Sequence, residues 1–349
     1  MKPAENTIVS IASGSPFFCL QKPDTNDIMV YILGGKSSQS FPPQSPLPEL
    51  LLARFNEKTP QRFSIKQENH YSLEAFKQDF QSIKIPLLEA QSIKPTSKSE
   101  YMIQVTEAVN SLQAGPMEKV VLSQQQFDNK VLDKVMMRFL QVCKTQNAYC
   151  YLLHTSEETW IGASPELLLK TDYHSVESMA LAGTRLVNQS ESKWGHKEVS
   201  EQNIVGQYVL DTFHKLGFKD VKLNESFTKS AGGVQHICNT IMGKALANSN
   251  WLDIIEQLHP TPALGGFPKV DAMAFIQGME KFDRDLFGGF IGIASQTEME
   301  LFVNIRSASL FSNGIRFLAG AGINKDSQPE KEWQETNHKI DVIRRAITI

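Results

Sequence analysis

The sequence contains few cysteines, and none lies at a spacing typical of a metal site or a redox motif. The four are Cys19, Cys143, Cys150 and Cys238, which form no CxxC pair and have no histidine at metal-ligand spacing. We interpret them as reduced packing residues of a cytoplasmic protein. No apolar run approaches the ~20 residues that a membrane-spanning helix needs. The N-terminus lacks the basic start and apolar core of a secretory signal.

The chain also has no excess of positive charge. Its 349 residues include 35 Lys and Arg against 38 Asp and Glu, a formal net charge of -3. This balance argues against binding to nucleic acid or to an anionic membrane surface. The nucleotide-binding motif GxxxxGK[ST] is absent, and Gly320-x-Gly322 lacks the third glycine of a dinucleotide fingerprint. A content of 41% hydrophobic and 21% charged residues is ordinary for a soluble globular protein.

Short apolar and β-branched segments alternate with helical patterns along the chain. Strands are predicted at 119–124, 149–153, 158–161, 167–171, 175–181, 234–242, 290–294, 299–305 and 315–319. Helices are predicted at 72–93 (as far as Pro86), 101–113, 131–146, 192–216, 251–258, 271–282 and at the C-terminus. Because the strands come in antiparallel-looking groups separated by helices, the predicted class is α+β. The polar stretch 91–99 suggests a boundary between an N-terminal part, 1–95, and the remainder, 96–349, within one compact unit.

The stretch 319–339, AGAGINKDSQPEKEWQETNHK, combines small residues with charge. We expect AGAG to end a strand and to let a ligand approach the backbone closely. In the following helix Glu332 and Glu335 share one face, and Lys339 lies one turn beyond Glu335. This arrangement could hold a divalent cation together with an anionic ligand. The alternative is a glycine-rich turn followed by a solvated, charged helix.

A second acidic pair, Glu198 and Glu201, lies on the predicted helix 192–216. Each glutamate precedes an apolar residue, Val205 or Tyr208, by seven positions, which is close to two helical turns. Both carboxylates should therefore point inward, where they need a cation or a lysine. Two helices that each bring an inward E-x-x-E predict a magnesium site with oxygen ligands. The alternative is ordinary surface charge on both helices.

Other polar residues stand at the ends of predicted strands. Lys119 and Glu166, considered singly, have the simple interpretation of surface residues at strand ends. Arg306 ends an apolar strand, where it could clamp a carboxylate or form a salt bridge at the sheet end. Two glycine-containing loops, LAGTR (181–185) and HPTPALGG (259–266), could lie close to a ligand, and two prolines restrict the second.

Taken together, these segments resemble the chorismate-utilising enzymes, which include isochorismate, salicylate, anthranilate and aminodeoxychorismate synthases. The matching segments, in the family's order, are EKVVLSQ (118–124), IGASPELLL (161–169), LAGTR (181–185), KEVSEQ (197–202), HPTPALGG (259–266), LFGGFIG (286–292), VNIRSA (303–308), AGAGI (319–323) and EWQET (332–336). They extend from about residue 101 to the C-terminus, whereas the first hundred residues match only loosely. The resemblance implies two stacked antiparallel sheets with flanking helices and an active site between the halves.

The resemblance also implies the occupants of that site. A magnesium ion would be held by Glu201 and Glu335, with Glu198 and Glu332 close by through water. The residues that would hold the substrate carboxylates are Arg306, Gly320, Gly322 and Lys339. Thr184 and His259 would line the ring of chorismate, and Ala182 and Gly183 would also belong to the substrate-binding residues.

Within the family, two positions indicate which nucleophile is used. Lys119 resembles the general base of the water-using branch, because the ammonia-using enzymes typically have glutamine there. Ala182 stands where the aminodeoxychorismate branch typically has a nucleophilic lysine. Glu166 would then be the general acid, for which its pKa must be raised.

The implied activity is that of an isochorismate synthase, a magnesium-dependent isomerase acting on chorismate. The resemblance suggests a monomer that serves menaquinone or siderophore biosynthesis. One alternative is a salicylate synthase, which adds pyruvate elimination. Another is a chorismate-binding protein without catalysis, and a nucleotide-binding enzyme has less support.

Overall fold

The computed structural model describes residues 3–38, 40–186, 194–231 and 234–348, which form eight helices and seventeen strands. The helices are α1 (Pro3–Ala12), α2 (Leu73–Phe80), α3 (Lys98–Ala114), α4 (Val135–Thr145), α5 (His196–Lys215), α6 (Trp251–Leu258), α7 (Lys269–Met279) and α8 (Pro329–Thr348). The strands are β1 (Phe17–Gln21), β2 (Asp27–Lys36), β3 (Glu49–Ala53), β4 (Gln61–Ser72), β5 (Lys119–Asp128), β6 (Tyr149–His154), β7 (Thr159–Ser164), β8 (Leu167–Thr171), β9 (Ser175–Leu186), β10 (Lys219–Leu223), β11 (Phe227–Ala231), β12 (Val234–Lys244), β13 (Gly266–Phe267), β14 (Phe290–Ala294), β15 (Met299–Val303), β16 (Ser307–Phe311) and β17 (Gly314–Ile323). No helix in these ranges is both long and apolar enough to cross a membrane.

The strands are joined by antiparallel pairing into one long sheet. Its order is β12, β9, β8, β15, β14, β3, β4, β2, β1, β6, β7, β16, β17 and β5. β10 and β11 share the other edge of β12, and β13 extends the sheet beyond β5. The α+β class is therefore confirmed. The two stacked halves that we expected are connected by hydrogen bonds through β1 to β4, which come from the first 95 residues.

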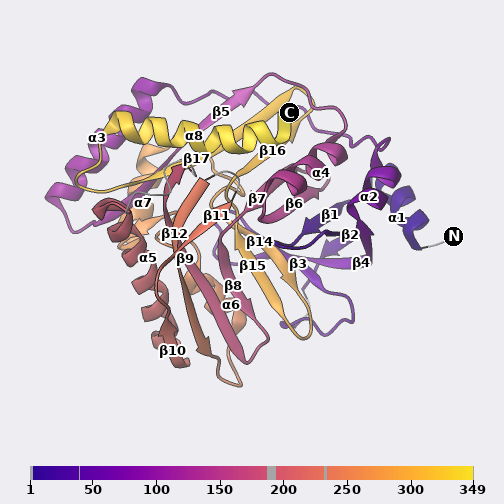
Figure 1. Cartoon of the computed structure of the whole chain (residues 1–349), viewed down its shortest axis with the longest axis horizontal. Coiled ribbons are helices and arrows are strands. Elements are labelled where there is room, and N and C mark those ends of the chain that lie inside the picture. Colours follow the sequence, from indigo (N-terminus) through magenta and orange to yellow (C-terminus); the bar gives the residue numbers. More distant parts are fainter. Residues whose placement is uncertain (1–2, 39, 187–193, 232–233, 349) are drawn as a thin grey trace.

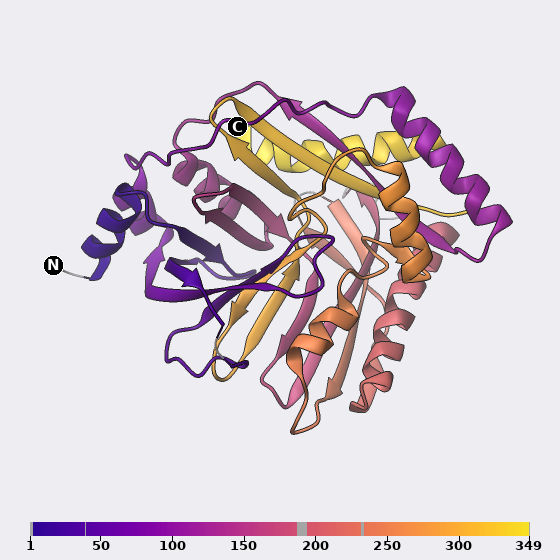
Figure 2. The same ribbon diagram turned by 180° about the vertical axis from the view of Figure 1, so that it is seen from behind.

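The two ends of this sheet lie against each other. Residues of β5 and β17, from one end, and of β9 and β12, from the other, line a common cavity. Figure 1 shows α8 lying across β5, β16 and β17, while β8, β9 and β12 spread out below them. Figure 2, from behind, shows α3, α5, α6 and α7 gathered on one side of the molecule. The fold thus brings segments that are far apart in the sequence to one place.

Helix α8 covers β17 through a buried stripe. Ile340, Ile343 and Ile347 are buried, and the stripe continues backward through Thr336 to Glu332 at a spacing of four residues. Such a spacing keeps side chains on one helical face. Glu332 therefore begins the buried stripe of α8.

The prediction that the small-residue run ends a strand is wrong. β17 continues through this run, because Gly320 pairs with Ser123 and Gly322 with Val121 of β5. A Cβ atom on Gly322 would lie 2.8 Å from Glu201 Oε2 and 3.0 Å from Lys119 Cε. The glycine thus leaves room inside the sheet for two side chains rather than making a turn.

Other differences lie where the local pattern is weak. The predicted helix 72–93 ends at Phe80, and the elements that were not predicted at all include α1, β3, β4, β10, β11, β13 and β16. β10, with the sequence KDVKL, is mostly exposed and forms by pairing with β12. Such a strand depends on its neighbour more than on its own apolar pattern. Of the predicted helix 192–216, positions 192 and 193 lie outside the described residues.

Candidate active site

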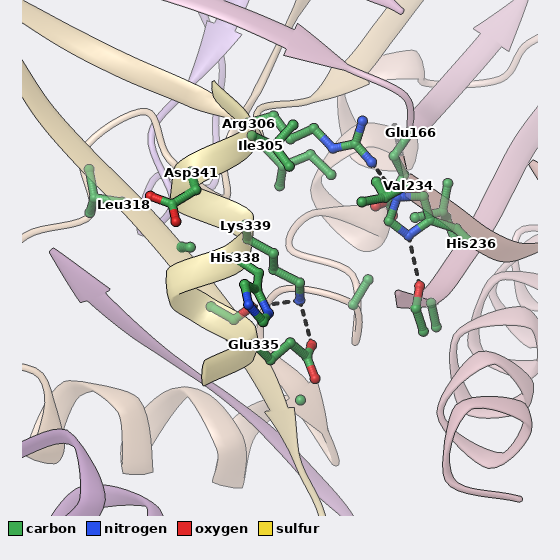
Figure 3. A pocket seen from close by; sticks show the side chains of 18 of the residues that line it. Glu166, Val234, His236, Ile305, Arg306, Leu318, Glu335, His338, Lys339 and Asp341 are labelled. Carbon is green, nitrogen blue, oxygen red and sulfur yellow. Dashed lines mark hydrogen bonds and ion pairs between the residues drawn. The ribbon is translucent and has the colours of Figure 1, made fainter. Parts of the chain in front are cut away.

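A cavity of about 860 Å³ lies between the two ends of the sheet, beside α5 and α8. Most of the predicted site residues line it, namely Lys119, Glu166, Ala182, Gly183, Glu201, Arg306, Gly320, Gly322, Glu335 and Lys339. Figure 3 shows Glu166, His236 and Arg306 grouped on one side of Lys339, with Leu318 and Asp341 on the other. The structure thus assembles in space a set of residues that the sequence separates widely.

Glu166 is held in the connection between β7 and β8. Its backbone N–H lies 3.3 Å from Ser164 Oγ, and its carbonyl accepts a hydrogen bond from Val303 N at 3.0 Å. The side chain is 2% exposed, and Oε1 has no hydrogen-bond partner among the described residues. Burial raises the pKa of Glu166 to about 8, although Lys119 and two other lysines act in the opposite direction. The carboxyl group is therefore largely protonated at neutral pH and can donate a proton.

We expect the change Glu166→Gln to stabilise the protein at alkaline pH. The folded-state pKa lies above the ordinary value of 4.5, so Glu166 favours folding fully below pH 4.5 and loses this contribution as pH rises through about 8. The variant should thus gain up to a few kcal/mol of unfolding free energy at pH 9, at about 1.4 kcal/mol per pKa unit. At pH 4.5 the difference should nearly vanish.

Chemical denaturation at the two pH values measures this effect. The exposed Glu157 provides a matched control, because Glu157→Gln should change stability little at either pH. Equal stability of Glu166→Gln and the parent protein at pH 9 would contradict a protonated, buried Glu166.

Lys119 is the first residue of β5 and is also 2% exposed. Its aliphatic stem lies against Gly322 of β17, next to the carboxylate of Glu201. Lysine is seldom buried to this extent. The interpretation of Lys119 as a surface residue at a strand end is therefore wrong, and so is the corresponding one for Glu166.

Two of the four predicted glutamates reach the cavity. Glu201 continues the buried stripe of α5 formed by Val205 and Val209, so its carboxylate points inward as expected. Glu335 reaches the cavity from α8, where its Oε1 lies 2.8 Å from Lys339 Nζ. The same ammonium group donates a hydrogen bond to the carbonyl of Gly320 at 2.9 Å. Lys339 is thus oriented toward β17 by both contacts.

The other two glutamates do not line the cavity. Glu332 is buried in the α8 stripe, and Glu198 packs on Gly183, where an added Cβ would come within 2.8 Å of Glu198 Cβ. In the part of the chain that the structure describes, no group of three His, Cys, Asp or Glu side chains could hold a metal ion. A cation at this site would therefore depend on Glu201 and Glu335, with further oxygens from water or substrate. The magnesium site stays a prediction.

Two predicted ring-lining residues need separate mention. His259 lies outside the cavity lining, because its ring is buried against Phe290 and its Nε2 lies 3.2 Å from the carbonyl oxygen of Arg54. Its loop reaches the cavity through Ala263 and Leu264 instead. Thr184 belongs to β9, but its side chain lies outside the described residues.

His236 of β12 was missed by the sequence analysis. It is buried, lines the cavity and contacts both Arg306 and Gly183: its Nε2 faces Arg306 Nη2, and its Nδ1 lies 2.7 Å from Gly183 O. The available signal was a histidine near the start of a predicted strand, between Val234 and Ile237. Figure 3 shows the imidazole ring of His236 beside the guanidinium group of Arg306.

The charges around the cavity suit a small anionic ligand. Burial lowers the pKa of Arg306 only to about 10, so the guanidinium remains a cation at neutral pH. Lys119 and Lys339 line the same cavity. Guanidinium and ammonium groups bind carboxylates, the former often through two parallel hydrogen bonds. A buried carboxylic acid and a buried lysine beside such cations could transfer protons to and from a bound acid.

Comparison with known proteins gives results consistent with this geometry. A profile of the chorismate binding enzyme family matches residues 48–348. The isochorismate synthase MenF of Bacillus subtilis is 30% identical over 285 residues, which cover 78% of this chain and 59% of the relative. The isochorismate synthase EntC of Escherichia coli K12 is 31% identical over 298 residues, or 81% and 74% of the two chains. The chain thus spans less than two thirds of the length of the first relative.

Among solved structures, the menaquinone-specific isochorismate synthase MenF of Escherichia coli superimposes with a TM-score of 0.80. The match covers 98% of this chain and 91% of the other, with 21% sequence identity. At this level of identity the similarity establishes a shared fold, and it extends over β1 to β4 as well as over the cavity.

Proposed function

Because this chain belongs to the chorismate binding enzyme family, we propose that it is an isochorismate synthase, which converts chorismate reversibly into isochorismate. One observation carries the proposal: a buried lysine, Lys119, and a buried carboxyl group with a raised pKa, Glu166, line the same cavity. This acid–base pair matches a reaction in which one hydroxyl group enters and another leaves. The names of the two relatives support the same activity.

The cavity would bind chorismate through its two carboxylates. Arg306 and Lys339 supply the positive charge, and Gly320 and Gly322 of β17 line the cavity beside them. Binding at fixed cations orients the ring between Lys119 and Glu166. Such orientation is itself a large part of catalysis, because reacting atoms must lie within about 3–3.5 Å of each other.

The proton transfers follow from the two buried groups. Lys119, in its neutral form, accepts a proton from the water molecule that attacks ring C2. The ring double bond shifts, and the C4 hydroxyl leaves with the proton of Glu166 as water. One water enters and one leaves, so the product is an isomer of the substrate. The raised pKa of Glu166 supports its part as the acid.

The carboxylates of Glu201 and Glu335 fit a magnesium ion, which prefers oxygen ligands and keeps several positions for water and substrate. Gly322 supports this fit, because the absence of a Cβ makes room for Glu201. A bound ion would orient the ring carboxylate and offset its charge. In the absence of an ion, Lys339 offsets the charge of Glu335.

Incubation of the purified protein with chorismate and magnesium should give isochorismate as the main product. Chromatographic separation with product standards measures it. Salicylate and pyruvate as main products would indicate a salicylate synthase instead, and anthranilate formed with ammonia would contradict both. Magnesium-dependent binding of chorismate without turnover would favour a non-catalytic binding protein. A cytoplasmic location, a monomeric state, a boundary near residue 95 and a menaquinone or siderophore pathway stay predictions.

A further inference from the structure

Strands β9 and β12 pair regularly except at one point beside the cavity. Gln235 pairs with Arg185 and Ile237 with Ala182, so β9 has one additional residue opposite His236. Gly183 lies in this bulge with a φ of +63°, a left-handed conformation that glycine adopts readily. Bulges re-aim backbone groups and side chains. Here the carbonyl oxygen of Gly183 lies 2.7 Å from His236 Nδ1.

This contact determines which ring nitrogen of His236 carries hydrogen. A carbonyl oxygen can only accept a hydrogen bond, so Nδ1 must be the donor. Burial, and next the charge of Arg306, lower the pKa of His236 well below 6.5, so the ring is neutral at physiological pH. In a neutral imidazole the other nitrogen is an acceptor. Nε2 therefore accepts the hydrogen bond that Arg306 Nη2 donates.

The backbone of Arg306 is also in an unusual conformation. Its φ is +50°, which residues with a side chain seldom adopt, and its carbonyl oxygen accepts a hydrogen bond from Ala163 N at 3.1 Å. Such conformations persist where the surroundings hold them, often at functional sites. This backbone directs the side chain toward β12, and His236 meets the guanidinium there.

We infer that His236 is a positioning residue, whose neutral ring, oriented by the bulge carbonyl of Gly183, holds the guanidinium of Arg306 in the orientation that binds a substrate carboxylate. The inference rests on the proposed function, because it assigns Arg306 to a substrate carboxylate. It assigns no proton transfer to His236. Two parallel hydrogen bonds to a carboxylate require a defined plane of the guanidinium, and a second acceptor on Nη2 restricts that plane.

Two substitutions separate the contacts of the ring. In His236→Gln the amide oxygen can replace the Nε2 acceptor toward Arg306. In His236→Asn the shorter amide can donate to Gly183 but cannot reach Arg306. We expect the glutamine variant to keep the KM for chorismate within about threefold. The asparagine variant should raise KM roughly 10- to 100-fold, the range expected for a hydrogen bond to a charged group, with a much smaller change in kcat.

The opposite order, an asparagine variant with normal KM and a glutamine variant with raised KM, would overturn the inference. Equal effects of both changes on KM would also overturn the inference, and so would a loss of activity confined to kcat. The same change of the exposed His174, His174→Gln, should leave KM unaltered. In a protein that already carries Arg306→Gln, adding His236→Asn should raise the KM for chorismate little further, because the contact between the two side chains is already absent. Unfolding temperatures of all variants identify any that do not fold.

Nitrogen-15 NMR of the histidine-labelled protein tests the orientation of the ring without reference to turnover. The inference requires the Nδ1–H tautomer at His236, and an Nε2–H tautomer would overturn it. If chorismate is bound but not converted, its Kd replaces KM in the comparison, and the proposed function fails while the positioning role is still tested. If chorismate does not bind to the parent protein, both the proposed function and the assignment to a substrate carboxylate fail.

Discussion

Replacing Lys119 by methionine should lower kcat by about 10²–10⁴-fold, the usual contribution of a general base. Methionine has a similar length and is apolar, so it can occupy the buried position beside Gly322 without leaving a cavity. The fold should therefore persist, and removing a buried amine should leave stability unchanged or raise it. Steady-state kinetics with chorismate, together with thermal unfolding, measures both effects.

Lys222, an exposed lysine of β10, provides the matched control, because Lys222→Met removes the same charge away from the cavity. It should leave kcat within about twofold of the parent, as expected for a surface change. Turnover of the Lys119 variant within threefold of the parent would exclude Lys119 as the base. Some other group would then have to activate the water.

Replacing Glu335 by alanine should reduce magnesium-dependent turnover to background. The change removes one of the two carboxylates that reach the cavity from α5 and α8. A catalytic metal ion stabilises the charge of the transition state by several kcal/mol. This corresponds to a loss of roughly three orders of magnitude. In the parent protein, removing magnesium with a chelator should have a similar effect, and adding it back should restore activity.

Glu330 lies on the same helix but pairs with Lys98 at the protein surface, so Glu330→Ala serves as control and should keep normal magnesium dependence. Near-normal, magnesium-dependent activity of Glu335→Ala would show that the ion is held elsewhere. A variant that recovers activity only at much higher magnesium concentration would locate the defect in metal binding rather than in the fold.

The sequence alone predicts those elements whose own pattern is strong. Helix α6 begins and ends where predicted, at Trp251 and Leu258, because its apolar stripe is continuous and proline follows it. The inward direction of Glu201 follows from the spacing of the α5 stripe. The same periodicity placed Glu198 inward as well. Glu198 does lie on the face of α5 that meets β9, where it packs against Gly183 beside the cavity rather than in its lining.

Local patterns indicate which way a side chain points but not what it meets. The contact of Lys119 with Gly322 depends on the pairing of β5 with β17, about 200 residues apart in the sequence. The role inferred for His236 depends on a bulge in β9 that no local pattern in β12 reveals. The glycine run of β17 resembles a turn for the same reason: the local sequence does not reveal that β5, about 200 residues earlier, pairs with it.

The pairing of β5 with β17 restricts where this chain can gain or lose a residue. The two strands pair without interruption from Ile315 and Asp128 to Ile323 and Val120. Since alternate side chains lie on opposite faces, one inserted residue in either strand would turn the following side chains to the wrong face. Gly322 would then no longer lie beside Lys119 and Glu201. Among related sequences, we therefore expect insertions and deletions near the site to occur mainly in the exposed β10–β11 region, where the sheet ends.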